Sequence, residues 1–357
     1  MPLTILQVAF PFARVSRDSV GGAEQILAAC DAAVMRAGHR SIVVAREGSK
    51  VAGDLIPVPG TRRADDPHAR AGAHANHREA IDGAISRFGV DVLHFHGLDF
   101  DRYLPSEGVP ALVTLHLAPF AYSAAALTSE RAGTYFNCVS QTQHGSCPEI
   151  PNLLAPILNG VDVERLRPNL QGRRVHTLVL ARICPEKGVH LAIEAAKKAD
   201  ADLVIAGEVF PYADHERYFA EEIRPRLDAR RVFIGPIGFA RKRDLLQSAR
   251  CLLVPSLIAE TSSLVAMEAF ACGTPVIGFR RGALSEIIDE AVTGVLVDDA
   301  DEMAAAIARA DAFAAAACAE TARRRFSAAR MGRDYIALYE RLGGRSQQRR
   351  YSERVAS

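Results

Sequence analysis

Two carboxylates in an apolar segment are the residues of this sequence whose chemistry stands out most. Glu260 and Glu268 are eight residues apart, and no other charged residue occurs between Glu260 and Arg280. A carboxylate in apolar surroundings is destabilising by several kcal/mol unless a partner hydrogen-bonds it. The neighbouring sequence supplies no such partner for Glu268. The segment therefore predicts either a ligand site or a core helix that carries one satisfied glutamate.

The residues around Glu268 indicate a short helix. Three cap-type residues precede the apolar run 264–272: Thr261, Ser262 and Ser263. Gly273 ends the run, so a helix of about nine residues is expected to begin near the serines, with Glu260 in its entry loop. The free backbone N–H groups at a helix start suit a phosphate. The segment thus predicts an acceptor for sugar hydroxyls, a cradle for a diphosphate and a second acceptor for a ribose.

Two cations form a second candidate site. Arg182 ends an expected strand, and Lys187 opens the following helix. Such a pair can neutralise the charge that grows on a leaving diphosphate, which a metal ion does in other enzymes. The chain has five lysines against 38 arginines, so Lys187 departs from the chain's composition. The alternative for both residues is surface salt bridging.

Histidines and glycines supply weaker candidates. His116 and His96 each end an apolar strand, 111–116 and 92–96, where a histidine is either a core group or a site residue. Gly21 and Gly22 could bring backbone N–H groups close to an anion, or could form a flexible turn. The G-x-G-x-x-G spacing of a dinucleotide fingerprint is absent, so an NAD-dependent dehydrogenase is disfavoured.

No metal site is predicted. Asp99 and Asp101 form a D-x-D pair, which we interpret as a loop with solvated carboxylates. The seven cysteines are odd in number, scattered and without a C-x-x-C pair, which is typical of reduced thiols rather than disulfides or zinc ligands. We therefore expect no metal and no other cofactor.

The composition is that of a globular protein with room for two cores. The 357 residues are 49% hydrophobic and 24% charged, with a net charge of +1. No run approaches a membrane span and no signal peptide is recognised, so a cytoplasmic location is expected. The stretch 323–354 has ten arginines against three acidic residues. This stretch predicts a solvated helix face with a loose tail or, as the alternative, contact with an anionic membrane surface; no nucleic-acid module is recognised.

Apolar runs alternate with helical stretches twice along the chain, which predicts two doubly wound parallel sheets with helices on both faces. The first set has expected strands at 4–10, 41–45, 90–95, 111–116 and 136–140 and helices near 23–36 and 75–87. The second has strands at 175–181, 202–207, 231–235, 251–255, 275–279 and 294–297. The domain boundary is expected near residue 168, after four prolines. Ligands of such domains bind at the carboxyl ends of the strands.

Motifs along most of the chain resemble those of retaining glycosyltransferases of family four, which have the GT-B fold. They appear in family order: Gly21-Gly22-Ala23-Glu24, His94-Phe95-His96-Gly97, Thr114-Leu115-His116, Asn159-Gly160-Val161-Asp162, the Arg182 to Gly188 turn, Pro255-Ser256 with Glu260 and Glu268, and the segments 271–276, 282–286 and 293–297. The resemblance implies two Rossmann-like domains facing a central cleft. The first would span 1–168 with a closing helix at about 331–342, the second 169–330, and a basic tail 343–357.

The resemblance implies transfer of a sugar, with retention, from a nucleoside-diphosphate donor to a hydroxyl of a glycan, lipid-linked or small-molecule acceptor. In the family, the residues matching Arg182 and Lys187 bind the diphosphate, and the one matching His116 faces the transferred sugar. The expected catalytic residues are His116, Glu260, Arg182 and Lys187. The expected donor-binding residues are Gly22, Arg182, Lys187, Gly235, Ile237, Glu260, Ser262, Ser263, Leu264 and Glu268. Gly21 and His96 are assigned to the acceptor side.

The chain departs from the family pattern in one place. Many family members have an aromatic residue and then glycine where this chain has Ser262 and Ser263, whose hydroxyls add bulk near the sugar. The base and the sugar of the donor therefore stay open. The segment 62–78 either borders the acceptor or is a polar surface linker. A nucleotide-sugar epimerase or hydrolase and a non-catalytic sugar-nucleotide binding protein remain as alternative functions.

Overall fold

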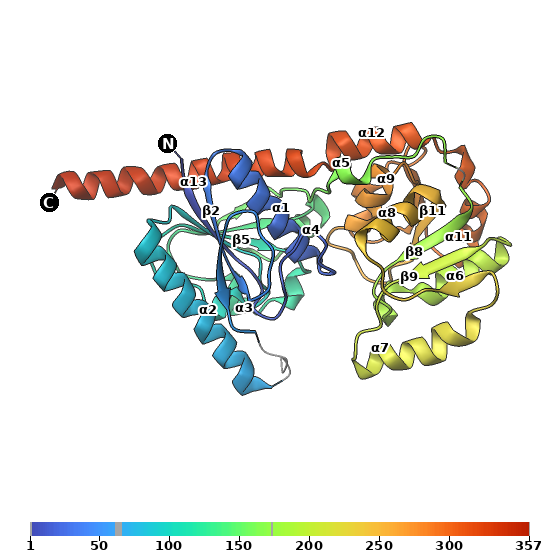
Figure 1. The fold of residues 1–357 in the computed structure, drawn as a ribbon, viewed down its shortest axis with the longest axis horizontal. Coiled ribbons are helices and arrows are strands. Elements are labelled where there is room, and N and C mark those ends of the chain that lie inside the picture. Colours follow the sequence, from blue (N-terminus) through green and yellow to red (C-terminus); the bar gives the residue numbers. More distant parts are fainter. Residues whose placement is uncertain (1, 61–65, 173, 357) are drawn as a thin grey trace. The chain divides into compact units, whose positions relative to one another are not determined.

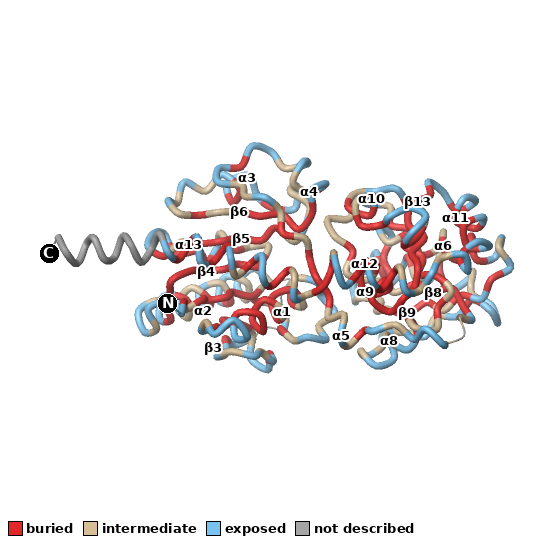
Figure 2. The backbone as a smooth tube through the Cα atoms, turned by 90° about the horizontal axis from the view of Figure 1, so that it is seen from above, coloured by how far each residue is buried: buried red, intermediate tan, exposed pale blue. Residues whose placement is uncertain are grey.

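The chain forms two compact units. The structure is a computed structural model that describes residues 2–60, 66–172 and 174–356, with side chains through Gly344. The first unit comprises residues 1–159 and 329–357, and the second comprises residues 160–328. Figure 1 shows each unit as a sheet flanked by helices. Figure 2 shows that the strands are largely buried, while much of the surface of the helices and loops is exposed.

The first unit has a seven-stranded parallel sheet in the order β3-β2-β1-β4-β5-β6-β7. The strands are β1 Thr4–Val8, β2 Arg40–Arg46, β3 Asp54–Val58, β4 Val92–Phe95, β5 Ala111–Leu115, β6 Thr134–Cys138 and β7 Leu153–Leu154. Those in the centre are buried on both faces and mostly apolar, because helices cover both sides of a parallel sheet. The strand order reverses between β1 and β4, which is the topology that defines a ligand-binding switch point.

Helices and short 3-10 turns connect these strands. They are α1 Gly22–Arg36, α2 Pro67–Phe88, η1 Phe100–Arg102, η2 Pro119–Ala121, α3 Ala124–Leu127 and α4 Gln141–Gly145. The last helix, α13 Ala328–Ala356, packs on this unit although it follows the second unit in sequence. The hydroxyl of Tyr339 lies 2.7 Å from Nδ1 of His94, and that of Tyr335 lies 3.1 Å from Oγ1 of Thr114. These buried polar contacts join α13 to the middle of the first sheet.

The second unit has a six-stranded parallel sheet in the order β10-β9-β8-β11-β12-β13. The strands are β8 His176–Leu180, β9 Leu203–Ala206, β10 Arg231–Phe233, β11 Ala249–Val254, β12 Val276–Phe279 and β13 Gly294–Val297. The helices are α5 Val163–Leu166, α6 Val189–Lys198, α7 Ala213–Tyr218, α8 Phe239–Ser248, α9 Leu264–Ala271, α10 Leu284–Ile287, α11 Ala300–Ile307 and α12 Ala315–Arg325. Shorter turns are η3 Pro185–Lys187, η4 Phe219–Ile223, η5 Arg224–Arg226 and η6 Ala310–Ala312. Its switch point lies between β8 and β11.

The division between the units differs from the boundary expected at residue 168. It falls at 159/160, because the following residues bond to the second unit. The backbone N–H of Val161 donates to the carbonyl of Phe326 over 2.8 Å, and Sγ of Cys272 lies 2.9 Å from the carbonyl oxygen of Leu166. The prolines between residues 148 and 168 interrupt regular secondary structure there. The contacts with Phe326 and Cys272 place residues 160–168 in the second unit.

Three elements differ from the sequence prediction. The strand β3 was not predicted; it contains Pro57 and lies at the sheet edge, where a missing N–H is tolerated. The helix α2 begins at Pro67, with Asp66 as its capping residue, so most of the segment 62–78 is helical; residues 61–65 lie outside the described residues. The helix α13 continues to Ala356, where a loose tail was expected, and its C-terminal sequence contains good helix formers.

None of the described helices is both long enough and apolar enough to cross a membrane.

Candidate functional site

The second unit brings its two candidate segments together at the switch point of its sheet. The turn that carries Arg182 and Lys187 follows β8, and the segment from Pro255 to Ser263 follows β11. These two strands are adjacent and parallel, so both segments leave the same edge of the sheet. The fold therefore places the turn that carries Arg182 and Lys187 beside the segment that carries Glu260.

Backbone contacts fix how closely the two segments approach. The N–H of Leu257 donates to the carbonyl of Glu186 over 2.8 Å. Gly188 has φ +59°, and a Cβ atom at this position would lie 2.2 Å from the carbonyl oxygen of Pro255. Only glycine combines this left-handed conformation with such a close approach. Gly188 therefore allows the turn after β8 to pack on the segment after β11.

Lys187 and Glu260 form an ion pair across this junction. Nζ of Lys187 lies 2.6 Å from Oε1 of Glu260, with side-chain exposures of 22% and 10%. The backbone of Glu260 is itself held in place, because the N–H of Ala283 donates to its carbonyl over 2.7 Å and Gly282, at φ +57°, leaves room for it. The ion pair therefore holds the Lys187 ammonium and the Glu260 carboxylate next to each other at the edge of the sheet.

Glu268 has a partner that sequence reasoning did not find. Nζ of Lys242, on α8, lies 2.5 Å from Oε1 of Glu268, with side-chain exposures of 21% and 8%. Glu268 lies in α9, and its helix position agrees with the expectation. The pairing offsets the desolvation of the buried carboxylate. A carboxylate has several lone pairs, so Oε2 keeps the capacity to accept from a ligand hydroxyl.

The start of α9 carries polar groups that could contact a ligand. Ser263 is the N-cap residue, and its side chain makes no capping hydrogen bond. The Ser262 hydroxyl oxygen is buried and has no hydrogen-bond partner among the described residues. Leu264 is the first helical residue. Backbone N–H groups at such a helix start favour an anion.

Three further predicted donor residues lie on loops at the same edge of the sheet. Arg182 directs its guanidinium carbon over the ring of Phe210 at 5.7 Å. Gly235, at φ +74°, accepts a hydrogen bond from the N–H of Gly207 over 3.0 Å, and Ile237 lies half-buried beyond it. The structure thus joins Lys187 directly to Glu260, while Arg182 contacts the segment after β9.

In the first unit, a group of buried histidines occupies the equivalent edge. His96 and His116 follow the neighbouring strands β4 and β5, and Nδ1 of His96 lies 3.0 Å from Nε2 of His116. Their rings are stacked, with centroids 5.3 Å apart. Burial lowers the pKa of His116 to about 4 and holds the pKa of His94 and of His96 well below the usual range. These imidazoles are therefore neutral near pH 7, and Nε2 of His96 has no hydrogen-bond partner among the described residues.

The glycines of the first unit lie at the start of α1. Gly21 is its N-cap residue, and both Gly21 and Gly22 are exposed. A Cβ atom on Gly21 would lie 1.9 Å from Oε2 of Glu24, so the carboxylate of Glu24 covers this glycine. Burial raises the pKa of Glu24. The helix start is therefore next to an acidic side chain.

The expectation that Asp99 is solvated was wrong. Its carboxylate lies 2.6 Å from Nε2 of His74 and accepts a hydrogen bond from the Tyr103 hydroxyl over 2.9 Å, and its side chain is 10% exposed. The partners come from α2 and from the residue after η1, which the sequence did not bring together. Asp101 is more exposed and pairs with Arg102 at 3.5 Å.

One sequence signal could have identified Lys242. Lysine is rare in this chain, and the departure from composition that singled out Lys187 applies equally to Lys242. A second missed group contains Cys184, Glu186 and His215. It could not be found from cysteine spacing, because its histidine and its carboxylate come from separate elements.

Comparisons with known sequences identify the second unit. Residues 174–311 match the family model described as glycosyl transferases group 1. An uncharacterized glycosyltransferase of Methanocaldococcus jannaschii is 26% identical over 231 residues, which are 60% of this chain and 63% of that protein. A D-inositol 3-phosphate glycosyltransferase of Mycobacterium avium is 33% identical over 185 residues, 46% of this chain and 42% of that protein. The matches span about half the length of these curated relatives.

Solved structures resemble the whole chain. AviGT4, a glycosyltransferase involved in avilamycin A biosynthesis, superposes with a TM-score of 0.72 at 24% identity, covering 96% of this chain and 98% of that one. Anabaena HepE in complex with UDP and glucose superposes with a TM-score of 0.71 at 18% identity, covering 94% and 99%.

Fold and family follow from these findings. Two parallel-sheet units of this topology, matched along almost their full length, define the GT-B fold, which confirms the predicted α/β class. Residues 174–311, which make up most of the second unit, are similar in sequence to the group 1 glycosyltransferases.

Proposed function

We propose that the protein is a retaining glycosyltransferase that moves a sugar from a nucleoside-diphosphate donor to a hydroxyl of an acceptor, without a metal ion. The observation that carries the proposal is the pairing of two carboxylates with two lysines in the second unit. Lys187 pairs with Glu260 at 2.6 Å, and Lys242 pairs with Glu268 at 2.5 Å. The complex of HepE with UDP and glucose makes UDP-glucose the first donor to test.

The proposed reaction exchanges one bond at the anomeric carbon. The bond from that carbon to the diphosphate oxygen breaks, and a bond from the same carbon to the acceptor oxygen forms on the same face. The acceptor proton passes to the leaving phosphate. Negative charge grows on the diphosphate during this step, so fixed positive groups near it lower the barrier.

Each residue has a role that its position supports. Lys187, Arg182 and the N–H groups at the start of α9 stabilise the leaving diphosphate. Glu260 accepts from sugar hydroxyls, and its pairing with Lys187 places a hydrogen-bond acceptor beside a cation. Glu268 accepts from a ribose hydroxyl through the oxygen that Lys242 does not hold. The resemblance adds His116, which acts on the transferred sugar as a neutral group.

The acceptor is proposed only by class, as a hydroxyl of a glycan, a lipid-linked sugar or a small molecule. The name of the Mycobacterium avium relative makes inositol phosphates a reasonable first small-molecule acceptor to screen. For a lipid-linked acceptor, the basic stretch 323–354 is the part of the chain that we propose to meet an anionic membrane surface.

The first experiment measures nucleotide binding by calorimetry and thermal shift. UDP, GDP, ADP and dTDP are compared with and without Mg²⁺ on wild type and on Glu268→Ala. We expect one nucleotide to bind without metal and to bind more weakly to the variant. If none of the four binds wild type, the proposed function is wrong. Donor turnover in the absence of any acceptor would favour a hydrolase or an epimerase instead.

A paired variant separates the ribose role of Glu268 from its structural role. Lys242→Met leaves a buried carboxylate unpaired, and we expect it to lower the free energy of unfolding by about 1–3 kcal/mol. Adding Glu268→Gln removes that charge and restores much of the stability. The double variant should still show a donor KM about tenfold above wild type, because a ribose acceptor is weakened. Recovery of the wild-type KM together with stability would contradict the ribose assignment.

A further inference from the structure

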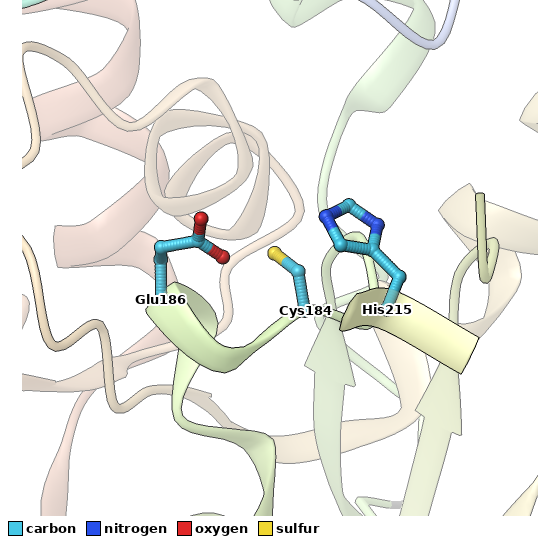
Figure 3. A group of neighbouring side chains, drawn as sticks. All are labelled: Cys184, Glu186 and His215. Carbon is cyan, nitrogen blue, oxygen red and sulfur yellow. The ribbon is translucent and has the colours of Figure 1, made fainter. Parts of the chain in front are cut away.

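Three potential metal ligands meet beside the turn that carries Lys187. One ligand atom each from Cys184, Glu186 and His215 lies within 4.8 Å of the other two. Figure 3 shows the Cys184 sulfur between the Glu186 carboxylate and the His215 ring. Cys184 lies just before η3, Glu186 lies within η3, and His215 lies in α7. The group therefore links two separate elements of the second unit.

The histidine of this group lacks a full set of partners. His215 is 5% exposed, and its Nδ1 has no hydrogen-bond partner among the described residues. The Asp214 carboxylate forms only a long ion pair with this histidine, with 4.0 Å between its oxygen and Nε2 of His215. An unsatisfied buried polar group is destabilising. A ligand that engages the imidazole would offset this loss.

The cysteine and the glutamate provide complementary donors. The Cys184 side chain is buried, and its sulfur contacts the carbonyl of Arg182 only weakly, at 3.8 Å. Glu186 is exposed, so one side of the group is open to solvent. Thiolate, imidazole and carboxylate are the ligands that zinc-class ions prefer, with three protein ligands and one open position. Magnesium and calcium favour oxygen ligands alone.

We propose that Cys184, Glu186 and His215 bind one zinc-class divalent cation that fastens α7 to the turn carrying Lys187. The cation replaces the thiol proton, which passes to solvent, and the thiolate and carboxylate together offset its two positive charges. The fourth position is taken by water on the Glu186 side. This site is separate from the ion pair of Lys187 with Glu260.

Side-chain and backbone contacts connect the proposed metal ligands to Arg182 and Lys187. The ring of His215 stacks on Phe210 at 6.2 Å, and the guanidinium of Arg182 lies over the same Phe210 ring at 5.7 Å. Glu186 directly precedes Lys187. A bound cation therefore restrains both Arg182 and Lys187. The consequence for donor binding rests on the proposed function: the cation tightens diphosphate binding without contacting the diphosphate.

The test is a titration of the full chain with Co²⁺ and Zn²⁺ after removal of metal by a chelator. We expect one equivalent of Co²⁺ to bind and to give the charge-transfer absorption of a thiolate ligand. Cys184→Ser and His215→Phe should weaken binding at least about tenfold. His215→Phe keeps an aromatic ring against Phe210, and circular dichroism of both metal-free variants checks that they fold.

Cys147→Ser is the matched control. Cys147 lies in the first unit with its sulfur 3.4 Å from that of Cys138, so these two neighbouring thiols are a second place where Co²⁺ could bind. The control should bind as wild type does. The proposal is overturned if wild type binds no cation, or if Cys184→Ser and His215→Phe bind as tightly as wild type.

A second measurement distinguishes this proposal from the proposed function. Nucleotide binding to wild type and to Cys184→Ser is compared with and without Zn²⁺, and we expect Zn²⁺ to strengthen it several-fold in wild type alone. Metal titration needs no nucleotide, so a protein that binds Co²⁺ but no nucleotide keeps the metal site and loses the proposed function. A nucleotide affinity that Zn²⁺ leaves unchanged in wild type overturns the coupling.

Discussion

The two units share a topology but differ in the chemistry at their switch points. Both sheets follow the same order, with the reversal between β1 and β4 in the first and between β8 and β11 in the second. The first presents a stacked, neutral histidine pair, whereas the second presents two ion pairs. The same fold therefore carries neutral hydrogen-bonding groups in one unit and paired charges in the other, and the side chains make the difference.

Burial explains why the histidines of the first unit are neutral, whereas the two paired lysines of the second unit lie partly in solvent. Desolvation by burial is the largest cause of the lowered pKa of both His96 and His116, because it disfavours the charged imidazolium. Lys187 and Lys242 of the second unit each keep about a fifth of their side-chain surface exposed and lie against a carboxylate. Each ammonium group therefore contacts both a carboxylate and water.

Removing Lys187 should have the largest effect, because it removes one of the two ion pairs that distinguish the second unit from the first. We expect Lys187→Ala to lower kcat by about 10²- to 10³-fold, because a group that stabilises the charge of the leaving diphosphate is lost. Steady-state kinetics with the identified donor would measure this. Lys187→Arg, which keeps the charge, is the control and should retain more activity. Wild-type kinetics for Lys187→Ala would exclude a role in the leaving step.

A smaller effect is expected where the two loops of the second unit meet. Gly188→Ala places a Cβ atom against the Pro255 carbonyl in a left-handed conformation and should lower the free energy of unfolding by about 3 kcal/mol. Gly83→Ala, inside α2 with no atom within 4 Å of the added Cβ, should stabilise by about 0.5–1 kcal/mol. Chemical denaturation of both variants measures the difference. Equal stabilities would show that the close approach at Gly188 is unimportant.

The smallest effect concerns the pH dependence of the first unit. His116 has a pKa lowered to about 4, so between pH 4 and about 6.5 the unfolded chain binds more protons than the folded chain. The free energy of unfolding should therefore rise as pH increases through that window. His116→Asn should reduce this increase in the free energy of unfolding by about 1–2 kcal/mol. The difference between variant and wild type at pH 8, where the histidine is neutral in both states, measures the effect of the substitution on packing. An unchanged pH slope would show that His116 is not held neutral by burial.

The second unit also shows how far local sequence predicts a site. Ser263 occupies the N-cap position of α9 and Gly273, at φ +79°, follows the helix, so the helix begins and ends where the cap-type residues and the glycine predicted. The position of Glu268 in that helix was correct for the same local reason. The partner of Glu268 was not predicted, since Lys242 lies in α8 and reaches it only because α8 packs on α9.

Edge elements were harder to predict than central ones. Central strands such as β4 and β5 are fully buried and mostly apolar, which the sequence shows directly. The edge strand β3 has the sequence Asp-Leu-Ile-Pro-Val, with a charge at its start and a proline inside it. An edge strand bonds on one side only and tolerates both features, so composition alone does not indicate it.

The sequence by itself determined the two alternating strand and helix sets, the helix that carries Glu268, and the turns that carry Arg182 and Lys187, because periodicity, caps and glycines act over a few residues. The tertiary structure decided which charges meet. It paired Lys187 with Glu260 and Lys242 with Glu268, gave Asp99 a histidine partner, and brought His215 to Cys184 and Glu186. Each contact joins residues from separate elements, and only the packing of those elements sets the distance between them.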